Sequence, residues 1–224
     1  SSDLVIVLFV LLIMAATLYY WPAGGRAELI RCIAAAGGIE LIPGGTPADL
    51  DKSEFGSPSG IPLLHHGDLK MSQSTAIENY MSLLSFPDLA PQQRARDAQF
   101  CCIKEDVMAG MYKVFFDPAT KEEGGKEKAA VSLGAVTSKW YPVIDKLCPA
   151  DGFFNGQAYP TAADIAVMNI CDAVWCFEVG NRWAKVDWAT YPKMRALATR
   201  TAESASMKPY LEKSQTFKAN PMGL

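Results

Sequence analysis

The most informative part of this chain is Gly60–Tyr80, G-I-P-L-L-H-H-G-D-L-K-M-S-Q-S-T-A-I-E-N-Y. Gly67-Asp68 is a turn signal between two short apolar runs, which predicts a β-hairpin. The polar pair Gln73 and Ser74 then opens an apolar-periodic segment, which predicts the start of a helix. Because a helix start presents unpaired N–H groups and a partial positive charge, it favours a carboxylate ligand.

Pro62 stands where the first strand of this hairpin begins, and it has no N–H to donate. If the Ile61–Pro62 bond is cis, the backbone of Ile61 can pair with an extended, peptide-like ligand. Together with the helix start at Gln73, this predicts a site for a small anionic peptide.

This arrangement resembles the thioredoxin-like half of a glutathione transferase, a family that pairs a buried cis-proline with a Gln-Ser helix start. Leu18–Arg31, L-Y-Y-W-P-A-G-G-R-A-E-L-I-R, resembles the family's first strand, catalytic loop and first helix. Phe153–Val167, F-F-N-G-Q-A-Y-P-T-A-A-D-I-A-V, resembles the start of its sixth helix, and Y-P-K-M-R-A-L from Tyr191 resembles the next one. The resemblance covers nearly the whole chain after about residue 16 and points to the tyrosine-type classes (sigma, mu, pi and alpha).

The fold class implied by the resemblance is an α/β thioredoxin-like domain over residues 18–86, followed by an all-α domain over residues 92–224. Within the second part the sequence patterns predict helices over about 92–116, 125–147, 162–179 and 193–205. Thr161 and Asp164 have the spacing of a capping box at the start of the third of these helices.

The resemblance also implies a glutathione site. Tyr20 matches the tyrosine whose hydroxyl stabilises the thiolate of glutathione, because a hydrogen bond to the charged sulfur lowers the thiol pKa. Tyr19 points to the other face of the strand. The residues implied to contact glutathione are Trp21, Arg26, Lys52, Ile61, Pro62, Gln73, Ser74 and Asp106.

Several of these residues have assigned parts in the family. Gln73 and Ser74 would take the γ-glutamyl carboxylate, and Lys52 would take the glycine carboxylate. Asp106 would reach the amino group of a glutathione held by a neighbouring subunit of a homodimer, or it is an ordinary solvated helix residue. Arg26 either contacts the ligand or forms an ion pair at a helix start.

The site for a second, electrophilic substrate is expected between the loop after Tyr20, one long helix and the C-terminal tail. The helix residues concerned are Met108, Met111, Tyr112 and Phe115, at spacings that equally describe a core stripe.

The composition of the chain indicates which classes of protein it can belong to. With 224 residues, half of them hydrophobic, the chain can bury a substantial core. A formal net charge of −3 and the absence of a basic run argue against nucleic-acid binding. None of the six cysteines forms a C-x-x-C pair or has a histidine at zinc-ligand spacing, so we expect no metal and a reducing compartment.

The N-terminal segment, residues 1–17, departs from the family. The run Leu4–Leu18 is entirely uncharged, and the next charged residue is Arg26. Three interpretations stay open: a membrane anchor, an uncleaved signal-peptide core, and a segment buried against a protein partner.

Two functions follow. The first is a membrane-attached, glutathione transferase-like enzyme that conjugates glutathione to an electrophile or uses it in isomerase or peroxidase chemistry. The alternative is a non-catalytic subunit of transferase fold, anchored in a larger membrane protein complex.

Overall fold

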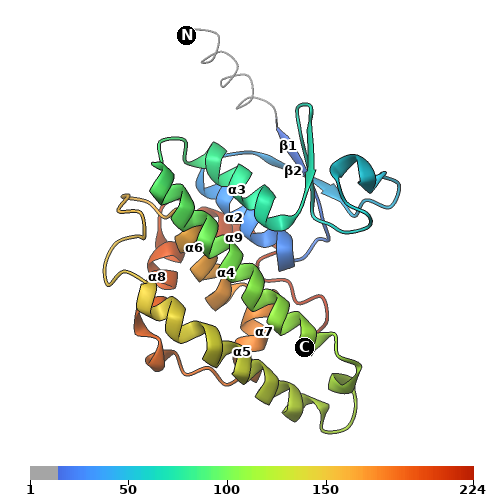
Figure 1. Cartoon of the computed structure of the whole chain (residues 1–224), viewed down its shortest axis with the longest axis vertical. Coiled ribbons are helices and arrows are strands. Elements are labelled where there is room, and N and C mark those ends of the chain that lie inside the picture. The colour runs from blue at the N-terminus through green and yellow to red at the C-terminus, as the bar shows by residue number, and fades with distance from the viewer. Residues whose placement is uncertain (1–14) are drawn as a thin grey trace.

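The computed structural model describes residues 15–224, which form a small mixed sheet beside a helical domain (Figure 1). The sheet has four strands in the order β2-β1-β3-β4. Its central strand β1 (Ala16–Tyr19) pairs in parallel with β2 (Leu41–Gly45) and antiparallel with β3 (Leu63–His66). The hairpin expected from the turn at Gly67-Asp68 is confirmed, since β3 pairs antiparallel with β4 (Leu69–Ser72).

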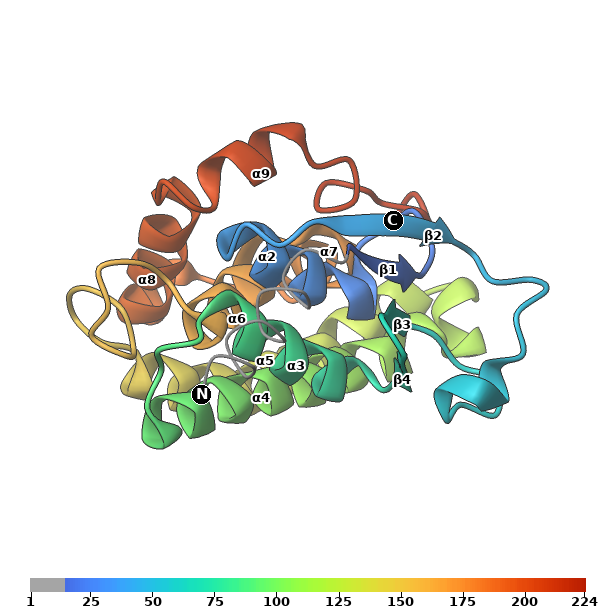
Figure 2. The same cartoon turned by 90° about the horizontal axis from the view of Figure 1, so that it is seen from above.

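Two helices connect the sheet to the rest of the molecule. The 3₁₀ turn η1 (Gly25–Ala27) leads into α2 (Glu28–Ala36), and α3 (Ser74–Ser85) follows β4. These helices pack on each other, and they face the helical domain through α6 and α4 (Figure 2). A further 3₁₀ turn, η2 (Lys52–Phe55), lies in the long connection between β2 and β3.

The helical domain is built around α6 (Ala162–Asp172), which is buried over nearly its whole length. It packs against α4 (Pro91–Phe115), α8 (Pro192–Glu203) and α2. The remaining helices are α5 (Gly125–Leu147), α7 (Val179–Trp183) and α9 (Lys208–Lys213), with the short turns η3 (Pro118–Lys121), η4 (Val174–Glu178) and η5 (Trp188–Thr190).

The start of α6 has the expected capping box, and the box is buried. The Thr161 backbone N–H donates to Asp164 Oδ2 at 2.9 Å, and the Phe154 N–H donates to Asp164 Oδ1 at 2.9 Å. A second carboxylate supports the same helix end, because Thr161 Oγ1 donates to Asp97 Oδ1 at 2.8 Å. Asp97 lies on α4, so these bonds tie the two helices together.

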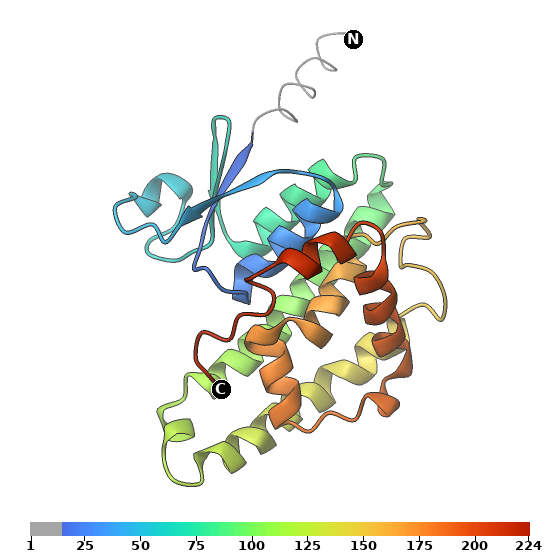
Figure 3. The ribbon, with the colours of Figure 1, turned by 180° about the vertical axis from the view of Figure 1, so that it is seen from behind.

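The prediction of one helix over residues 162–179 is wrong. The backbone leaves the helical conformation at Ala173 and again at Trp175, whose φ and ψ are −96° and 120°. Tertiary partners satisfy the freed backbone groups: the Asn181 amide donates to the Ile170 carbonyl at 2.9 Å, and the Val174 N–H donates to the Phe217 carbonyl at 3.0 Å. The helix α9, which lies alongside α2 (Figure 3), was not predicted from the sequence.

The first strand begins earlier than residue 18, where the N-terminal domain was expected to start. Ala16 and Leu18 are 0% and 4% exposed in the core of the sheet, so the end of the apolar run belongs to the globular fold. The rest of the segment assigned to a membrane anchor, residues 1–14, lies outside the described residues. In residues 15–224, none of the helices combines the length and apolar character needed to cross a bilayer.

Candidate active site

Tyr20 lies directly after β1, and its hydroxyl points toward the start of η1. The Arg26 backbone N–H donates to Tyr20 Oη at 3.2 Å. Burial raises the pKa of the Tyr20 phenol, although this bond and nearby positive charge act against the shift. The hydroxyl therefore stays protonated at neutral pH and can act as a hydrogen-bond donor. Tyr19 instead packs edge-on against Phe55, with ring centroids 6.0 Å apart.

A polar chain runs from Tyr20 to the start of α3. Arg26 Nε donates to Glu105 Oε1 at 2.6 Å, and Ser74 Oγ donates to Glu105 Oε2 at 3.3 Å. Burial tends to lower the pKa of Arg26, but Glu105 outweighs this effect and the net pKa is raised. One carboxylate on α4 thus joins the Arg26 and Ser74 side chains, and Tyr20 is linked to them through the Arg26 backbone N–H.

The cis peptide bond that the sequence suggested before Pro62 is present. The Ile61–Pro62 peptide is cis and precedes β3, with Pro62 buried and Ile61 half-buried. Gln73 is exposed and has φ = 73°, a left-handed conformation that is uncommon for residues other than glycine. Its carbonyl accepts from the Ile77 N–H at 3.0 Å, so this conformation fixes the first turn of α3.

The side chains of the remaining predicted site residues take no part in the hydrogen bonds of the polar chain. Trp21 is 54% exposed in the loop after Tyr20. Lys52 is half-buried in η2, and its side chain has no hydrogen bond within the described residues. Asp106 is exposed on α4, whereas its neighbour Glu105 faces Arg26 and Ser74.

Sequence analysis missed Glu105 and the buried ion pair next to it. Lys104 Nζ donates to Glu78 Oε1 at 2.5 Å and to Glu105 Oε2 at 3.3 Å, and Lys104 and Glu78 are almost wholly buried. A signal was available, since Lys104 interrupts the apolar spacing between Phe100 and Met108. A lysine on a buried helix stripe requires a carboxylate partner.

The helix residues expected to line an electrophile site form the core instead. Met108 and Met111 are 0% exposed and Phe115 is 2% exposed, so the core-stripe alternative is confirmed for them. Tyr112 differs from the other three because it is half-buried and lies beside Arg26.

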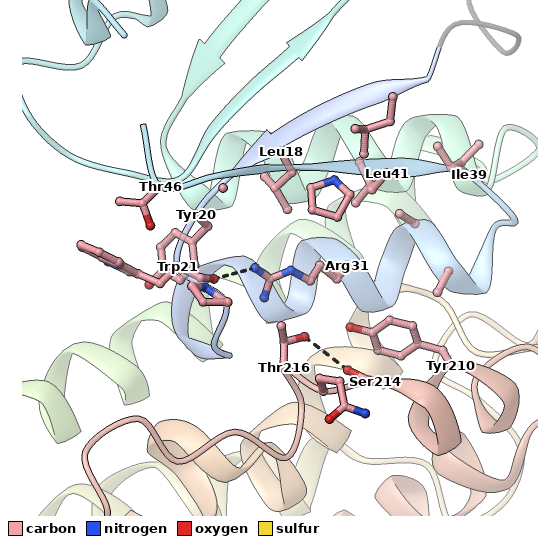
Figure 4. A pocket seen from close by; sticks show the side chains of 17 residues that line it. Leu18, Tyr20, Trp21, Arg31, Ile39, Leu41, Thr46, Tyr210, Ser214 and Thr216 are labelled. Atoms are coloured by element: carbon pink, nitrogen blue, oxygen red, sulfur yellow. Dashed lines mark hydrogen bonds between the residues drawn. The ribbon is translucent and has the colours of Figure 1, made fainter. Parts of the chain in front are cut away.

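An open cavity of about 710 Å³ lies next to Tyr20, between α2, β2 and the C-terminal tail (Figure 4). Most of its lining is apolar, from Leu18, Trp21, Ala34, Ile39 and Leu41, while Ser214 and Thr216 of the tail add hydroxyl groups. The cavity shares Tyr20 and Trp21 with the predicted glutathione site, but Ile61, Gln73 and Ser74 do not line it. It therefore lies beside the polar chain rather than over it.

The cysteines form no disulfide in the described part of the chain, and all but Cys102 are buried. Burial raises the thiol pKa of Cys32, Cys101 and Cys171 well above the ordinary value, as in structural cysteines. No cluster of histidine, cysteine and acidic side chains suited to a metal ion occurs among residues 15–224.

Comparison with known proteins identifies the architecture. Residues 105–214 match the family described as "Glutathione S-transferase, C-terminal domain". The comparison with curated protein sequences gives no match. A glutathione S-transferase structure from Caenorhabditis elegans is similar with a TM-score of 0.69 and 20% identity, covering 90% of this chain and 99% of that one.

Two further structures show the same similarity. Monomeric Na-GST-3 from Necator americanus has a TM-score of 0.69 at 20% identity, covering 88% of this chain and 96% of its own. Rat hPGDS complexed with a quinoline has a TM-score of 0.66 at 20% identity, covering 89% and 97%. At this identity the similarity establishes the fold, and the chemistry must be argued from the site.

Proposed function

We propose that this chain, which has the glutathione transferase fold, binds glutathione and activates its thiol through Tyr20. The thiolate would then be conjugated to an electrophile or used in isomerase or peroxidase chemistry. The observation that carries the proposal is the polar chain Tyr20–Arg26–Glu105–Ser74, which places a hydroxyl donor and a helix N-terminus in one connected site.

The site suits the chemistry of a γ-glutamyl peptide. The backbone of Ile61, fixed by Pro62, would pair with the cysteinyl part of glutathione in extended form. The N-terminus of α3, with Gln73 and Ser74, would hold the γ-glutamyl carboxylate. Trp21 would line the pocket, and Lys52 would approach the glycine carboxylate from η2.

Tyr20 supplies the chemical step. A free thiol has a pKa of about 8.5 and is mostly protonated at neutral pH. When the thiol proton leaves for solvent, the Tyr20 O–H donates to the sulfur anion and stabilises it. Because burial raises the pKa of Tyr20, the phenol keeps its proton while it does so.

The cavity beside Tyr20 supports an apolar second substrate. Its walls are mainly apolar, and its volume of about 710 Å³ lies within the usual range for small-molecule sites. Its position next to Tyr20 and Trp21 would bring an apolar electrophile close to the thiolate.

Substitution of Ser74 tests the binding step. We expect Ser74→Ala to weaken glutathione binding by about 1–3 kcal/mol, because a hydrogen bond to a charged group is lost. Ser85→Ala is the matched control, since Ser85 lies at the other end of α3 and bonds the Ile33 carbonyl. Calorimetry on the full chain that finds no binding at millimolar glutathione would refute the proposed function.

The part proposed for Asp106 requires a homodimer. Asp106 is exposed on α4, where it is free to reach the site of a neighbouring subunit. Sedimentation velocity with and without glutathione measures the oligomeric state, and a strictly monomeric protein would remove Asp106 from the site.

A further inference from the structure

Arg31, on α2, binds the loop that follows Tyr20. Its Nη2 atom donates to the Trp21 carbonyl at 3.1 Å (Figure 4), and its Nη1 atom donates to the Ala23 carbonyl at 2.8 Å. The same guanidinium lies 5.8 Å from the centroid of the Tyr20 ring. One side chain therefore contacts the loop from Tyr20 to Ala23 and fixes two of its carbonyl groups.

A buried carboxylate holds the guanidinium in this orientation. Arg31 Nη1 also donates to Glu28 Oε2 at 2.8 Å, one turn earlier in α2. The Glu28 side chain is 1% exposed and that of Arg31 is 17% exposed, so solvent screens this ion pair little. Because the donors of a guanidinium are fixed in one plane, the bond to Glu28 restricts where the remaining donors can point.

The helix α9 adds a third member to this arrangement. Tyr210 Oη donates to Glu28 Oε1 at 2.6 Å, so each oxygen of the carboxylate has its own donor. Burial raises the pKa of the Tyr210 phenol, which therefore keeps its hydrogen for this bond. The hydrogen bonds thus run from α9 through Glu28 and Arg31 to the loop after Tyr20.

We infer that Arg31 is a positioning residue, which fixes the loop after Tyr20 and so sets where the Tyr20 hydroxyl meets the sulfur of bound glutathione. Glu28 and Tyr210 hold the Arg31 guanidinium in the orientation that this requires. The position matters because the strength of a hydrogen bond falls steeply with its angle and distance. The inference rests on the proposed function, and it gives α9 a part in thiol activation although no residue of α9 belongs to the polar chain.

Amide hydrogen exchange on the full chain tests the positioning without glutathione. The Arg26 N–H donates to Tyr20 Oη at 3.2 Å, so its protection reports where the hydroxyl lies. Arg31→Lys keeps the charge but loses the planar donors, and exchange of this amide should become about 3–30-fold faster. Arg195→Lys is the matched control, since Arg195 pairs with Asp172 on α6 at 2.5 Å, and it should leave this exchange unchanged.

The pKa of the bound thiol tests the link to the chemistry. At saturating glutathione, the ultraviolet absorbance of the thiolate against pH gives the midpoint of thiolate formation. Arg31→Lys should raise this midpoint by about half to one pH unit, which lowers the thiolate population about 3–10-fold at pH values below both midpoints. In a Tyr20→Phe background the same substitution should not raise the midpoint further, because the hydroxyl that it positions is gone.

Tyr210→Phe is the second variant, and it decides the test if Arg31→Lys folds poorly. It keeps the ring and the ion pair between Glu28 and Arg31, and it removes only the donor to Glu28 Oε1. We expect exchange of the Arg26 amide to become about 2–5-fold faster and the thiolate midpoint to rise by less than that in Arg31→Lys. Exchange and midpoint equal to those of wild type would overturn the part assigned to α9.

Two failures are distinguishable. If wild-type protein does not bind glutathione, the proposed function fails and the inference fails with it. If wild type binds and forms thiolate, the inference alone is overturned when Arg31→Lys leaves the Arg26 amide exchange or the midpoint unchanged, or when its effect on the midpoint adds to that of Tyr20→Phe. Faster exchange that is equally large in α3 and α6 would assign Arg31 to general stability and would overturn it as well.

Discussion

At the position of Tyr20, burial and hydrogen bonding act on one phenol in opposite directions. Burial is the larger effect and keeps the hydroxyl protonated, while the Arg26 N–H fixes its orientation. A protonated, oriented phenol is suited to donate to an anion and not to remove a proton. In the proposed function, the tyrosine would therefore lower the pKa of a bound thiol and would not act as a base.

Tyr20→Phe should keep the fold and most of the affinity for glutathione, because the ring remains. It should raise the pKa of the bound thiol and slow conjugation about 10–1000-fold, the usual cost of one lost donor to developing charge. Steady-state kinetics against pH measure both effects. Tyr19→Phe should do much less, and equal activity of wild type and Tyr20→Phe would exclude Tyr20 from sulfur activation.

Lys104 is a second residue whose buried surroundings determine its contribution to stability. It is buried between Glu78 and Glu105, which hold its pKa above the ordinary value against the opposing effect of burial. Lys104→Met should lower the free energy of unfolding by about 3–5 kcal/mol, because Glu78 would be left buried without a partner.

Urea denaturation of Lys104→Met provides the measurement. Replacing both partners, Lys104→Met with Glu78→Leu, should restore much of the loss, since no buried charge remains in that pair. If the double variant is as unstable as the single one, the loss is due to packing and not to charge.

At the scale of elements, the start of α6 combines a helix cap with an interhelical contact. Asp164 caps α6 from within, and Asp97 reaches the same helix end from α4. Burial raises the pKa of Asp164 to about 6, even though several donors oppose the shift. The cap is therefore sensitive to pH.

The direction in which pH changes the stability follows from the protonation of Asp164 in the folded and unfolded states. In the unfolded chain an aspartate releases its proton near pH 4, whereas folded Asp164 keeps it up to about pH 6. The stability linked to this group is fully present below about pH 4 and is lost as the pH rises through 6. In Asp164→Asn, the difference in unfolding free energy between pH 4 and pH 7 should shrink by about 2–3 kcal/mol.

Denaturation at both pH values measures this difference. Asp151→Asn, at an exposed loop position, is the matched control and should leave the difference unchanged. An Asp164→Asn variant with the wild-type pH dependence would mean that the carboxylate is ionised in the folded protein across this range.

At the scale of the whole molecule, the apolar N-terminal sequence carries a prediction of its own. The strand β1 uses Ala16 and Leu18 for the core, which leaves Leu4–Ala15 as the uncharged sequence before the domain. Membrane attachment through this segment stays a prediction, and so does the compartment in which the globular part lies.

The full chain should partition into membranes and resist alkaline carbonate extraction. Val10→Lys should weaken retention, since a charge within an apolar segment costs about 2.5–3.5 kcal/mol on insertion scales. A shortened protein starting at Ala15 is the matched control, because a start at Thr17 would remove the first residue of β1. Complete extraction of the full chain would favour packing against a protein partner and strengthen the accessory-subunit alternative.

The elements that could be predicted from the sequence are those whose signals are local. The hairpin around Gly67-Asp68, the helix start at Ser74, the whole of α5 and the capping box of α6 depend on turn residues, apolar periodicity and caps within a few positions. The order of these elements was enough to indicate the two-part fold. The selection of Tyr20 over Tyr19, which followed from strand alternation and from spacing in the resemblance, stays a prediction.

The features that depend on partners distant in the sequence became visible only in the folded structure. At the break after α6, Asn181 and Phe217 form hydrogen bonds with the freed backbone groups. The sequence near residue 173 contains no pattern that predicts these partners. Glu105 faces the site and Asp106 faces solvent because α4 is rotated by its packing, which the helix period alone leaves undetermined. Arg26 and Glu105 meet only after the two domains pack together, since an ion pair between remote side chains is specified by packing and not by local sequence.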